Sequence, residues 1–511
     1  MYSITIVGGG TAGWMTAVLL NQTYNKFDRL VSIQVVESPD VDIVGVGEAT
    51  VPAIKDFLQV VGIDEADFIK HTNATLKTGI IFKNWCVPNE DGSLHSYMHP
   101  FDQERVEKRL DVATSWLLSS RAQGYDESVS LSFSLAKDNL TPKPFNSKPY
   151  QGLVGYSFHL DARLFGQYLR DYATSKGVSR IEAHVEKVNA RDGKITSLVT
   201  DGYEIRSELF IDCTGFQGLL ISELESDSNW QSYQDVLLCD KAVTIQRPHK
   251  PGYTPKSYTV SHALNAGWSW RIDLQNRTGH GYVYSSKYLE PDAAESEFRA
   301  HLGLDESDRF NHIDMRVGRR KQQWIGNCVA IGLSSGFIEP LESTGLHLIY
   351  LAARFVALHY NFEQNNDVVI GNYNKTMCKT YDELKDFIVL HYVLSDRTDS
   401  DFWCDVSKTL DGCSTLKSRL AVWKHKVCEY FDVSDSTSHM FSDVSYRYIL
   451  YGMKYYPELA VPFKPGEFDE VFDYLDNRKA QVCSHVMSHK AYLQDISGKS
   501  GFVSIDMSKG K

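Results

Sequence analysis

The 511-residue chain lacks the features that mark several specialised classes of protein. None of its nine cysteines forms a CxxC pair, so we expect neither a metal site nor a disulfide framework. No basic run offsets the formal charge of −12, which argues against nucleic acid or an anionic membrane as a partner. The most apolar stretch, 346–360, is interrupted by charged or polar residues, and no charged leader with an apolar segment precedes the first predicted strand. We therefore expect a cytoplasmic protein.

Internal repeats and low-complexity tracts are also absent, and the remaining composition is that of an ordinary globular protein. With 42% hydrophobic residues, the chain is long enough to bury a large core. Strand-like and helix-like segments alternate in the first part, and a β-rich block covers 235–285. From about residue 340 onward the pattern is helical and rich in aromatic residues. We expect two closely packed regions, 1–370 and 371–511.

A glycine-rich turn joins the first predicted strand, 4–7, to the first predicted helix, 14–21. Its glycines fit the GxGxxG spacing: Gly8, Gly10 and Gly13. The first makes the tight turn, the second admits a pyrophosphate, and the third lets the helix pack on the strand. Glu37 ends the second predicted strand, 31–37, where a carboxylate can hold a ribose hydroxyl. The pattern predicts a dinucleotide site.

Two later segments favour FAD over NAD as the dinucleotide. IDCTG at 211–215 and WIGNCVAIG at 324–332 each read as a strand followed by a turn of small residues, although either alone is unremarkable. Their order after the glycine turn is similar to the FAD-binding fold of aromatic hydroxylases. The glycine-rich loop VGVGEATVP at 44–52 is expected near the flavin. The residues expected to contact FAD are Gly8, Gly10, Thr11, Ala12, Gly13, Glu37, Ala49, Asp212, Gly326 and Leu333.

The segment FIEPLESTGLHLIY, 337–350, places an acid beside a site suited to an anion. Glu342 directly precedes Ser343, Thr344 and Gly345, and an apolar stripe at helical spacing follows from Leu346, so we expect a helix to begin about at Ser343. The free N–H groups of a helix's first turn attract an anion. The segment therefore predicts chemistry on a small anion, if the rest of the chain supplies a reagent.

With these pieces in order, the chain resembles the flavin-dependent halogenases of the tryptophan halogenase family over most of its length. The matching segments are GGGTAGW, GVGEATVP, LKTGIIFKNW, HPF, HLDARLF, DCTGFQGLLI, GWSWRI, NRTGHGYVYSS and GNCVAIGLSSGFIEPLESTG. The patterns GWxWxI and FxxPxxSxG are much more specific than the glycine turn. One departure is Asp273, which stands where the family pattern ends in proline, and it puts the local turn in doubt.

The resemblance implies a two-component enzyme with an α/β FAD-binding fold, an inserted β-sheet and a mainly helical C-terminal substrate region. Reduced FAD from a separate flavin reductase, oxygen, and chloride or bromide would yield hypohalous acid. Lys77 would relay that acid to an electron-rich aromatic ring, with Glu342 near the reacting carbon. The backbone of Thr344 and Gly345 would bind the halide. A desolvated lysine amine is easier to deprotonate, and a carboxylate can stabilise a cationic ring.

Each of these roles has a simpler alternative in the sequence. We expect one strand over 75–85, in which Lys83 shares a strand face with Lys77, and lysines are usually solvated. Glu342 could merely favour its helix N-terminus, as acids do, while Glu339 in the same segment is expected not to be catalytic. In the family, the tryptophans at positions matching Trp268 and Trp270 lie near the flavin and keep the substrate away, but such residues are ordinarily core aromatics.

The substrate is less clear than the reaction. His99 and Phe101 match a family loop whose rings sandwich an indole, and apolar ring faces suit an aromatic substrate. Tyr455 lies in an aromatic cluster, 446–458, where tryptophan-specific members bind the amino-acid group. Free tryptophan leads, and a simple indole or another aromatic is the alternative. The sequence does not fix the halide, the position halogenated or whether the chain is a homodimer.

Two other functions compete with halogenation. A one-component flavin monooxygenase would hydroxylate an aromatic ring, using NAD(P)H on the same chain. A non-catalytic flavin-binding scaffold would use the aromatic C-terminal region to bind a protein partner. Only a halogenase requires the motifs around Lys77 and Glu342.

Overall fold

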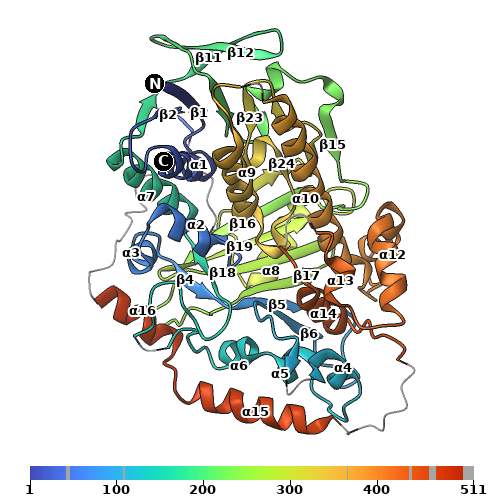
Figure 1. Ribbon diagram of the computed structural model, residues 1–511. Coiled ribbons are helices and arrows are strands. Elements are labelled where there is room, and N and C mark those ends of the chain that lie inside the picture. The colour runs from blue at the N-terminus through green and yellow to red at the C-terminus, as the bar shows by residue number, and fades with distance from the viewer. Residues whose placement is uncertain are drawn as a thin grey trace.

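The protein is described by a computed structural model that covers residues 1–41, 47–107, 110–144, 146–364, 366–436, 440–459, 466 and 468–498. Two large sheets and a helical C-terminal part share one main hydrophobic core (Figure 1). Within the described ranges, no helix is both long and apolar enough to cross a membrane.

The first large sheet carries the glycine-rich turn. Its strands, in spatial order, are β10 (Ser179–Glu182), β2 (Val31–Glu37), β1 (Tyr2–Val7), β14 (Leu209–Asp212), β23 (Cys328–Ala330) and β22 (Trp324–Ile325). β1 is parallel to both β2 and β14, because helices α1 (Thr11–Tyr24) and α7 (Ala162–Ser175) belong to the crossover connections. The predicted strands 4–7 and 31–37 and the helix after the turn are confirmed. Parallel pairing brings the carboxyl ends of β1, β14 and β23 to one edge.

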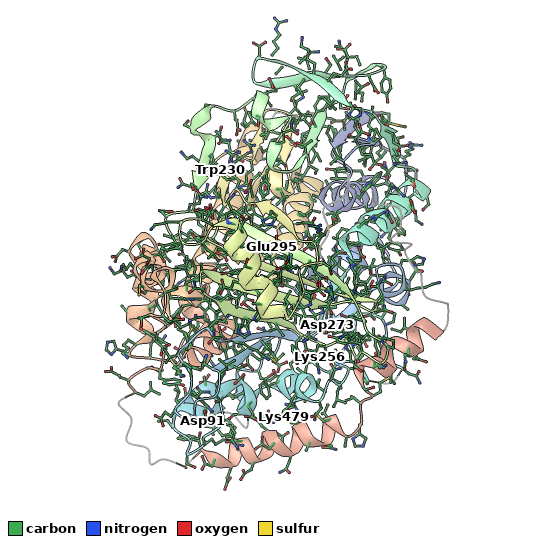
Figure 2. All side chains as sticks on the ribbon, turned by 180° about the vertical axis from the view of Figure 1, so that it is seen from behind. Asp91, Trp230, Lys256, Asp273, Glu295 and Lys479 are labelled. Carbon is green, nitrogen blue, oxygen red and sulfur yellow. The ribbon has the colours of Figure 1, made fainter. Side chains whose placement is uncertain are left out.

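The second large sheet is mostly antiparallel. Its order is β20 (Asn311–Asp314), β16 (Lys241–Pro248), β19 (Arg277–Tyr284), β18 (Gly267–Asp273), β17 (Thr259–Leu264), β5 (Gly79–Lys83) and β6 (Ser96–Pro100). Helix α8 (Pro291–Leu302) packs on its outer face (Figure 2). A small third sheet has the order β3 (Glu48–Ala49), β9 (Ser157–Leu160) and β4 (Thr75–Lys77).

The single strand predicted over 75–85 is wrong. The chain leaves β4 at Thr78, whose N–H bonds to the carbonyl of Ser257 at 2.8 Å, and then enters β5 in a different sheet. Lys77 and Lys83 therefore lie on separate strands and do not share a strand face.

Three further small sheets complete the strands. They are β11 (Val185–Arg191), β12 (Lys194–Thr200) and β13 (Glu204–Ile205); β15 (Trp230–Ser232), β21 (Gly318–Arg320) and β24 (Gly336–Phe337); and β7 (Val106–Glu107) with β8 (Leu110–Asp111). Short helices α2 (Ile54–Val61), α3 (Glu65–His71), α4 (Val112–Leu117), α5 (Tyr125–Val129) and α6 (Leu131–Lys137) pack near the third sheet and β6.

The last part of the chain is helical, as predicted. It contains α9 (Gly345–His359), α10 (Asp367–Val393), α11 (Asp401–Val406), α12 (Ser414–Trp423), α13 (Tyr430–Val433), α14 (Asp443–Gly452), α15 (Asp469–Cys483) and α16 (His489–Gly498). The expected boundary between residues 370 and 371 falls inside α10. Helices α15 and α16 run along the base of the molecule as a C-terminal arm (Figure 1).

Candidate functional site

The segment 337–350 forms a sharp bend rather than a direct entry into a helix. A 3₁₀ turn, Pro340–Glu342, is followed by Ser343 in the left-handed region at φ 61°, and α9 begins at Gly345. The helix start predicted at Ser343 is therefore two residues too early. A non-glycine residue in this conformation is uncommon, and it often marks a site whose geometry is held by its surroundings. The bend lets consecutive side chains point in different directions.

Glu342 lies at the centre of a buried pair of histidines. Its carboxylate is 1% exposed and accepts hydrogen bonds from His99 Nδ1 at 2.9 Å and from His391 Nε2 at 2.9 Å. Burial alone would raise its pKa, but the attraction of His99 and the hydrogen bonds from both histidines hold the pKa at about 2. Glu342 is therefore ionised at neutral pH, and it does not cap α9, whose N-cap has no side-chain hydrogen bond.

His391 is the site residue that sequence reasoning missed. It lies near the end of α10, fully buried, and its Nδ1 bonds to the carbonyl of Phe387 at 2.9 Å. A carbonyl only accepts, so Nδ1 donates to Phe387, and Nε2 is the ring nitrogen that faces the carboxylate of Glu342. Helical spacing alone made this histidine look like an ordinary core residue.

Lys77 ends β4 with its amine inside the protein. It is 0% exposed, and Nζ donates to Ser343 Oγ at 2.8 Å and to the carbonyl of Thr50 at 3.1 Å. Burial lowers the pKa of Lys77 to about 7, although the charge of Glu342 acts in the opposite direction. The structure thus brings Lys77 and Glu342 together through the bend at Ser343. Lys83, in contrast, is partly exposed on β5.

The start of α9 has the features expected of a site for a small anion. Thr344 is buried, whereas Gly345 is exposed, and a Cβ on Gly345 would meet no atom within 4 Å. The first turn contains no acidic residue, so its free N–H groups keep their attraction for an anion. The halide role of Thr344 and Gly345 stays a prediction that this geometry suits.

The glycine-rich turn fits the pyrophosphate of FAD. Gly8 has φ 111°, and a Cβ on Gly13 would lie 1.9 Å from the carbonyl oxygen of Gly8. A Cβ on Gly9 would lie 1.8 Å from Glu37 Oε2, so glycine is also required at this position, which the GxGxxG motif leaves open. Around Gly10, in contrast, a Cβ would meet nothing within 4 Å, and α1 begins there without a side-chain cap or an early acid. Open space before uncapped N–H groups is what a bound pyrophosphate needs.

Gly10→Val should weaken FAD binding without unfolding the protein. Gly10 has ordinary extended angles, φ −76° and ψ −177°, so valine meets no strain and no clash, but it fills the space before α1. We expect at least about a tenfold loss of FAD affinity, measured by fluorescence titration, with an unchanged melting temperature of the FAD-free protein. Gly13→Ala is the matched control and should lower the melting temperature. Unchanged FAD affinity in Gly10→Val would contradict the pyrophosphate placement.

The other residues expected to contact FAD lie in different surroundings. Both carboxylate oxygens of Asp212 accept hydrogen bonds from the loop that follows, including Leu220 N at 2.7 Å, so Asp212 shapes that loop. Glu37 is held by Trp14 and Arg180, which limits its freedom to reach a ribose. Ala49 is buried on β3, and Leu333 is exposed in a short 3₁₀ turn. Thr11 and Ala12 lie in the first turn of α1.

Gly326 lies at the far end of its strand from the glycine-rich turn. It forms the turn between β22 and β23 and packs against the carbonyl of Gly193. Its place in the fold does not support the predicted contact with FAD, because parallel strands gather their carboxyl ends at the opposite edge. Gly332, at that carboxyl end, packs against Ala12 instead. Of the expected loop 44–52, residues 44–46 lie outside the described residues.

Trp268 and Trp270 are core aromatics with different partners. Trp268 Nε1 donates to Glu339 Oε2 at 2.7 Å, and Tyr392 donates to the same oxygen at 2.6 Å. Burial raises the pKa of Glu339 to about 7. The indole N–H of Trp270 has no hydrogen-bond partner in the described part of the chain. Glu339 therefore anchors Trp268, in keeping with the expectation that it is not the catalytic acid.

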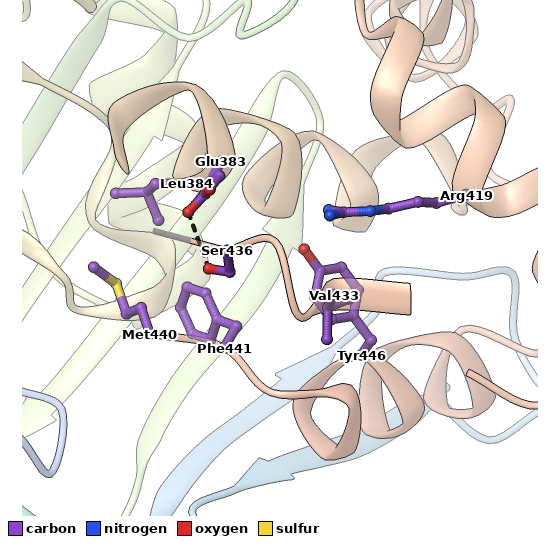
Figure 3. Close-up of a pocket in the computed structure, with 8 residues that line it drawn as sticks. All are labelled: Glu383, Leu384, Arg419, Val433, Ser436, Met440, Phe441 and Tyr446. Carbon is purple, nitrogen blue, oxygen red and sulfur yellow. Dashed lines mark hydrogen bonds between the residues drawn. The ribbon is translucent and has the colours of Figure 1, made fainter. Parts of the chain in front are cut away.

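The aromatic rings near Glu342 come from three parts of the chain. His99 belongs to β6 rather than to a loop, and Phe101 follows that strand with its ring 5.2 Å from Lys77 Nζ. The rings of Phe387 and Phe441 stack with their centroids 3.7 Å apart. These two centroids lie 5.9 Å and 6.1 Å from the ring centroid of His99. Phe441 also lines a neighbouring pocket, shown in Figure 3.

Tyr455 is not part of this aromatic group. Its hydroxyl donates to the carbonyl of Leu420 at 2.8 Å, beside α12. Tyr446 approaches the site instead, since its ring meets Phe387 edge-on at 4.9 Å and lines the pocket of Figure 3. The sequence could not distinguish the two tyrosines because they lie in the same aromatic cluster.

Asp273 is accommodated without proline by a local hydrogen-bond network. Its buried carboxylate accepts from Arg271, Tyr253 and Thr278, and from Lys256 N at 2.9 Å (Figure 2). Burial would raise the pKa of Asp273, but the hydrogen bond and charge of Arg271 outweigh it and lower the pKa to about 2. The departure from the family pattern therefore leaves the strand intact. No group of three metal-ligating side chains exists among the described residues.

Comparison with known families and proteins shows the family of the whole chain. A family model described as tryptophan halogenase matches residues 3–465. A tryptophan 6-halogenase of Streptomyces toxytricini is 36% identical over 82% of this chain and 83% of its own length. A 7-chloro-L-tryptophan 6-halogenase of Kutzneria sp. is 34% identical over 97% of this chain and 99% of its own.

Solved structures show the same fold. A tryptophan halogenase from Shewanella frigidimarina superposes with a TM-score of 0.91 at 33% identity, covering 99% of each chain. A flavin-dependent halogenase from Brevundimonas sp. gives 0.86 at 34% identity, covering 97% of this chain and 99% of its own. The similarity extends over both sheets and the helical C-terminal part.

Proposed function

Because this chain belongs to the tryptophan halogenase family, we propose that Lys77 and Glu342 are its halogen-transfer residues. Membership makes the chain a flavin-dependent halogenase that uses FAD, oxygen and a halide. The observation that carries the proposal is the buried amine of Lys77, joined through Ser343 to the buried, ionised Glu342. Neither ring hydroxylation nor a scaffold role requires this pair.

The glycine-rich turn would hold FAD, and the backbone of Thr344 and Gly345 would hold the halide; FAD reduced by a separate reductase would supply hypohalous acid from oxygen and that halide. We propose that Lys77 receives this acid inside the protein. Its amine can hold HOX by a hydrogen bond, or it can form a haloamine, in which N–X forms, the O–X bond breaks and water leaves. Both forms need an amine shielded from bulk water, and Lys77 is 0% exposed.

Glu342 has a role that follows from its charge. Attack of the ring on electrophilic halogen gives a cationic ring that carries one extra proton. A buried carboxylate with a pKa of about 2 stays ionised, so it can stabilise this cation and receive its proton as aromaticity returns. His391 and His99 fix the direction of the carboxylate.

The substrate we propose is an indole, with free tryptophan as the leading candidate. The relatives named above act on tryptophan or chlorotryptophan. Phe101 and the stacked pair of Phe387 and Phe441 offer apolar ring faces near Lys77 and Glu342. A cytoplasmic location and a homodimer stay predictions. The regioselectivity and the preference between chloride and bromide are not assigned.

The pH dependence of halogen transfer distinguishes the two forms of Lys77. Since burial lowers its pKa to about 7, the neutral amine grows from a minority to a majority between about pH 6 and about pH 8. A haloamine needs the neutral amine, so we expect the halogenated product per hypohalous acid formed to rise over this range. Quenched single-turnover reactions measure the product, and Lys77→Ala supplies the hypohalous acid yield at each pH. A falling ratio would instead favour a protonated lysine that hydrogen-bonds HOX.

A reductase-coupled assay tests the proposed function. The protein, a separate flavin reductase, oxygen, FAD and either chloride or bromide are incubated with tryptophan, indole or another aromatic, and products are analysed by mass spectrometry. We expect halide-dependent mono-halogenated product. Only hydroxylated product, or NADH oxidation without the reductase, would favour the monooxygenase, and no product with any substrate would favour the scaffold.

A further inference from the structure

The strand that carries Lys77 lies at the edge of its sheet. Among the residues that the structure describes, β4 pairs with β9 alone, where Leu76 is opposite Phe158 and Lys77 is opposite Ser157. The N–H of Leu76 does not join this ladder and instead donates to His489 Nε2 at 3.0 Å. A buried backbone N–H without a partner is costly, so this contact is needed where no further strand follows.

His489 is held in one orientation by a second hydrogen bond. It is 0% exposed, and its Nδ1 lies 3.2 Å from the carbonyl of Pro255, to which it donates. With Nδ1 as donor and Nε2 as acceptor, the ring is a neutral imidazole of defined tautomer. Burial lowers its pKa to about 4, which keeps this form at neutral pH. His489 thus acts as a spacer between two backbone segments.

The hydrogen bonds around His489 and Pro255 belong to a network that also fixes Thr78, the residue after Lys77. The carbonyl of Ser257 accepts from the N–H of Thr78 at 2.8 Å, and Ser257 N donates to Asn139 Oδ1 at 3.2 Å. Asn139 in turn donates to Pro255 O at 2.9 Å and accepts from His489 N at 2.9 Å. Leu76 and Thr78, on either side of Lys77, are therefore tied to one network that includes the first residue of α16.

We propose that His489, from the C-terminal arm, is a positioning residue that sets the place of the Lys77 amine, an inference that rests on the proposed function of Lys77. The backbone on both sides of Lys77 is fixed, so its Nζ is aimed at Ser343 and Thr50. A displacement of about 1 Å can cost a large factor in a reaction that depends on alignment.

Replacement of His489 by leucine and by glutamine tests this role. Leucine removes both hydrogen bonds, whereas glutamine can accept from Leu76 N and donate to Pro255 O. We expect His489→Leu to lower the halogenated product per hypohalous acid by about tenfold, with oxidant formation unchanged, and His489→Gln to restore most of it. His485→Leu, an exposed histidine in the same arm, should have no effect.

Hydrogen exchange provides a readout independent of activity. The Leu76 amide should exchange faster in His489→Leu than in wild type and be protected again in His489→Gln. If the leucine variant does not fold, His489→Asn replaces it, because asparagine is too short to reach both partners. Equal losses in the glutamine and leucine or asparagine variants, or no loss in either, would overturn the proposal. Absence of halogenation in wild type would instead overturn the proposed function.

A second inference concerns a cavity on the outer face of the large antiparallel sheet, beside the end of α8. Cross-strand pairing places Lys83, His262 and Ser269 in one row and Val260, Arg271 and His280 in the next. His301 and Leu302 from α8 close a cavity of about 190 Å³ over these rows. Figure 2 views the molecule from this side.

The lining of this cavity is positive or imidazole-rich and contains no acidic residue. Within the described residues Lys83 has no carboxylate partner, whereas Arg271 is paired with Asp273 at 2.8 Å. The rings of His262 and His301 are 4.7 Å apart. Burial and the charges of His301 and Lys83 lower the pKa of His262 to about 4. These rings are therefore neutral at neutral pH, and an anion in the cavity would be attracted by Lys83 and would accept hydrogen bonds from imidazole N–H groups.

We infer that this cavity binds a phosphate group, either as inorganic phosphate or as part of a nucleotide. Its volume exceeds that of one water by several-fold and suits a small oxyanion. Four strands (β5, β17, β18 and β19) and helix α8 supply the polar side chains, which places them around an anion rather than along one line. Ile272, the neighbour of Asp273 on β18, is buried in the main core. The cavity lies on the opposite face of the sheet.

Calorimetry on the FAD-saturated protein tests this site, because FAD then blocks the glycine-rich turn. Inorganic phosphate and a nucleoside monophosphate are titrated separately. We expect phosphate binding that the double variant His262→Asn, His280→Asn weakens at least about tenfold, and that the exposed control His312→Asn leaves unchanged. Tighter binding of the nucleotide would identify a nucleotide as the source. No binding of either ligand, or equal binding by the double variant, would overturn the inference.

Discussion

Lys77→Ala is expected to abolish regioselective halogenation while hypohalous acid is still formed. The substitution removes the amine proposed to receive the oxidant, and it leaves the residues of the glycine-rich turn and the start of α9 unchanged. Loss of a group that acts in proton transfer or covalent catalysis typically costs about 10²-fold to 10⁴-fold, so product should fall at least that far. Mass spectrometry measures the product, and a chemical scavenger measures the free oxidant.

The controls for Lys77→Ala separate chemistry from folding. Lys137→Ala, at an exposed lysine paired with Glu127, should retain full activity. FAD affinity and melting temperature of Lys77→Ala should show that the FAD-binding part is intact. Retention of regioselective halogenation by Lys77→Ala would show that another group delivers the halogen.

Glu342→Gln is expected to cause the second-largest loss. Glutamine keeps the size of the side chain but removes the charge proposed to stabilise a cationic ring, and it replaces the carboxylate that bonds to His99 and His391 by a neutral amide. Loss of one electrostatic stabiliser typically costs about 10²-fold in kcat. We expect this loss in kcat, measured under saturating indole, with oxidant formation unchanged.

Glu339→Gln is the matched control for Glu342→Gln, since both acids are buried in the same segment. The carboxylate of Glu339 accepts from Trp268 and Tyr392, and burial raises its pKa to about 7, so a neutral amide is a closer replacement there. It should retain most of the activity. Equal losses in the two variants would mean that the segment is sensitive to any substitution and that Glu342 has no special role.

Local signals predicted the framework well. The glycine turn, the flanking strands and the acid before α9 are short-range patterns, and each is set by neighbours in the sequence. The assignment of Lys77 and Glu342 to one site came from the family resemblance, and the structure brings these residues together.

Long-range contacts could not be read in the same way. His391 and His489 are ordinary histidines on helices, and only the fold reveals that one meets Glu342 and the other meets the strand of Lys77. The break at Thr78 was missed because both parts of 75–85 consist of β-type residues. The first strand ends there because the N–H of Thr78 bonds to the carbonyl of Ser257, which is distant in the sequence. Gly326 was expected near FAD because it belongs to a strand and turn of small residues. The direction of β23 instead places it at the edge of the sheet opposite the glycine-rich turn.

The central claim is that the oxidant passes inside the protein from the halide site at α9 to Lys77. The most direct test is a single-turnover reaction with bromide and tryptophan or indole in excess methionine, which consumes free hypobromous acid in solution. The account predicts that the yield of mono-brominated product in wild type is unchanged by the scavenger. Loss of the product in proportion to added methionine would show that the acid escapes into solvent before it reacts, and would contradict the account.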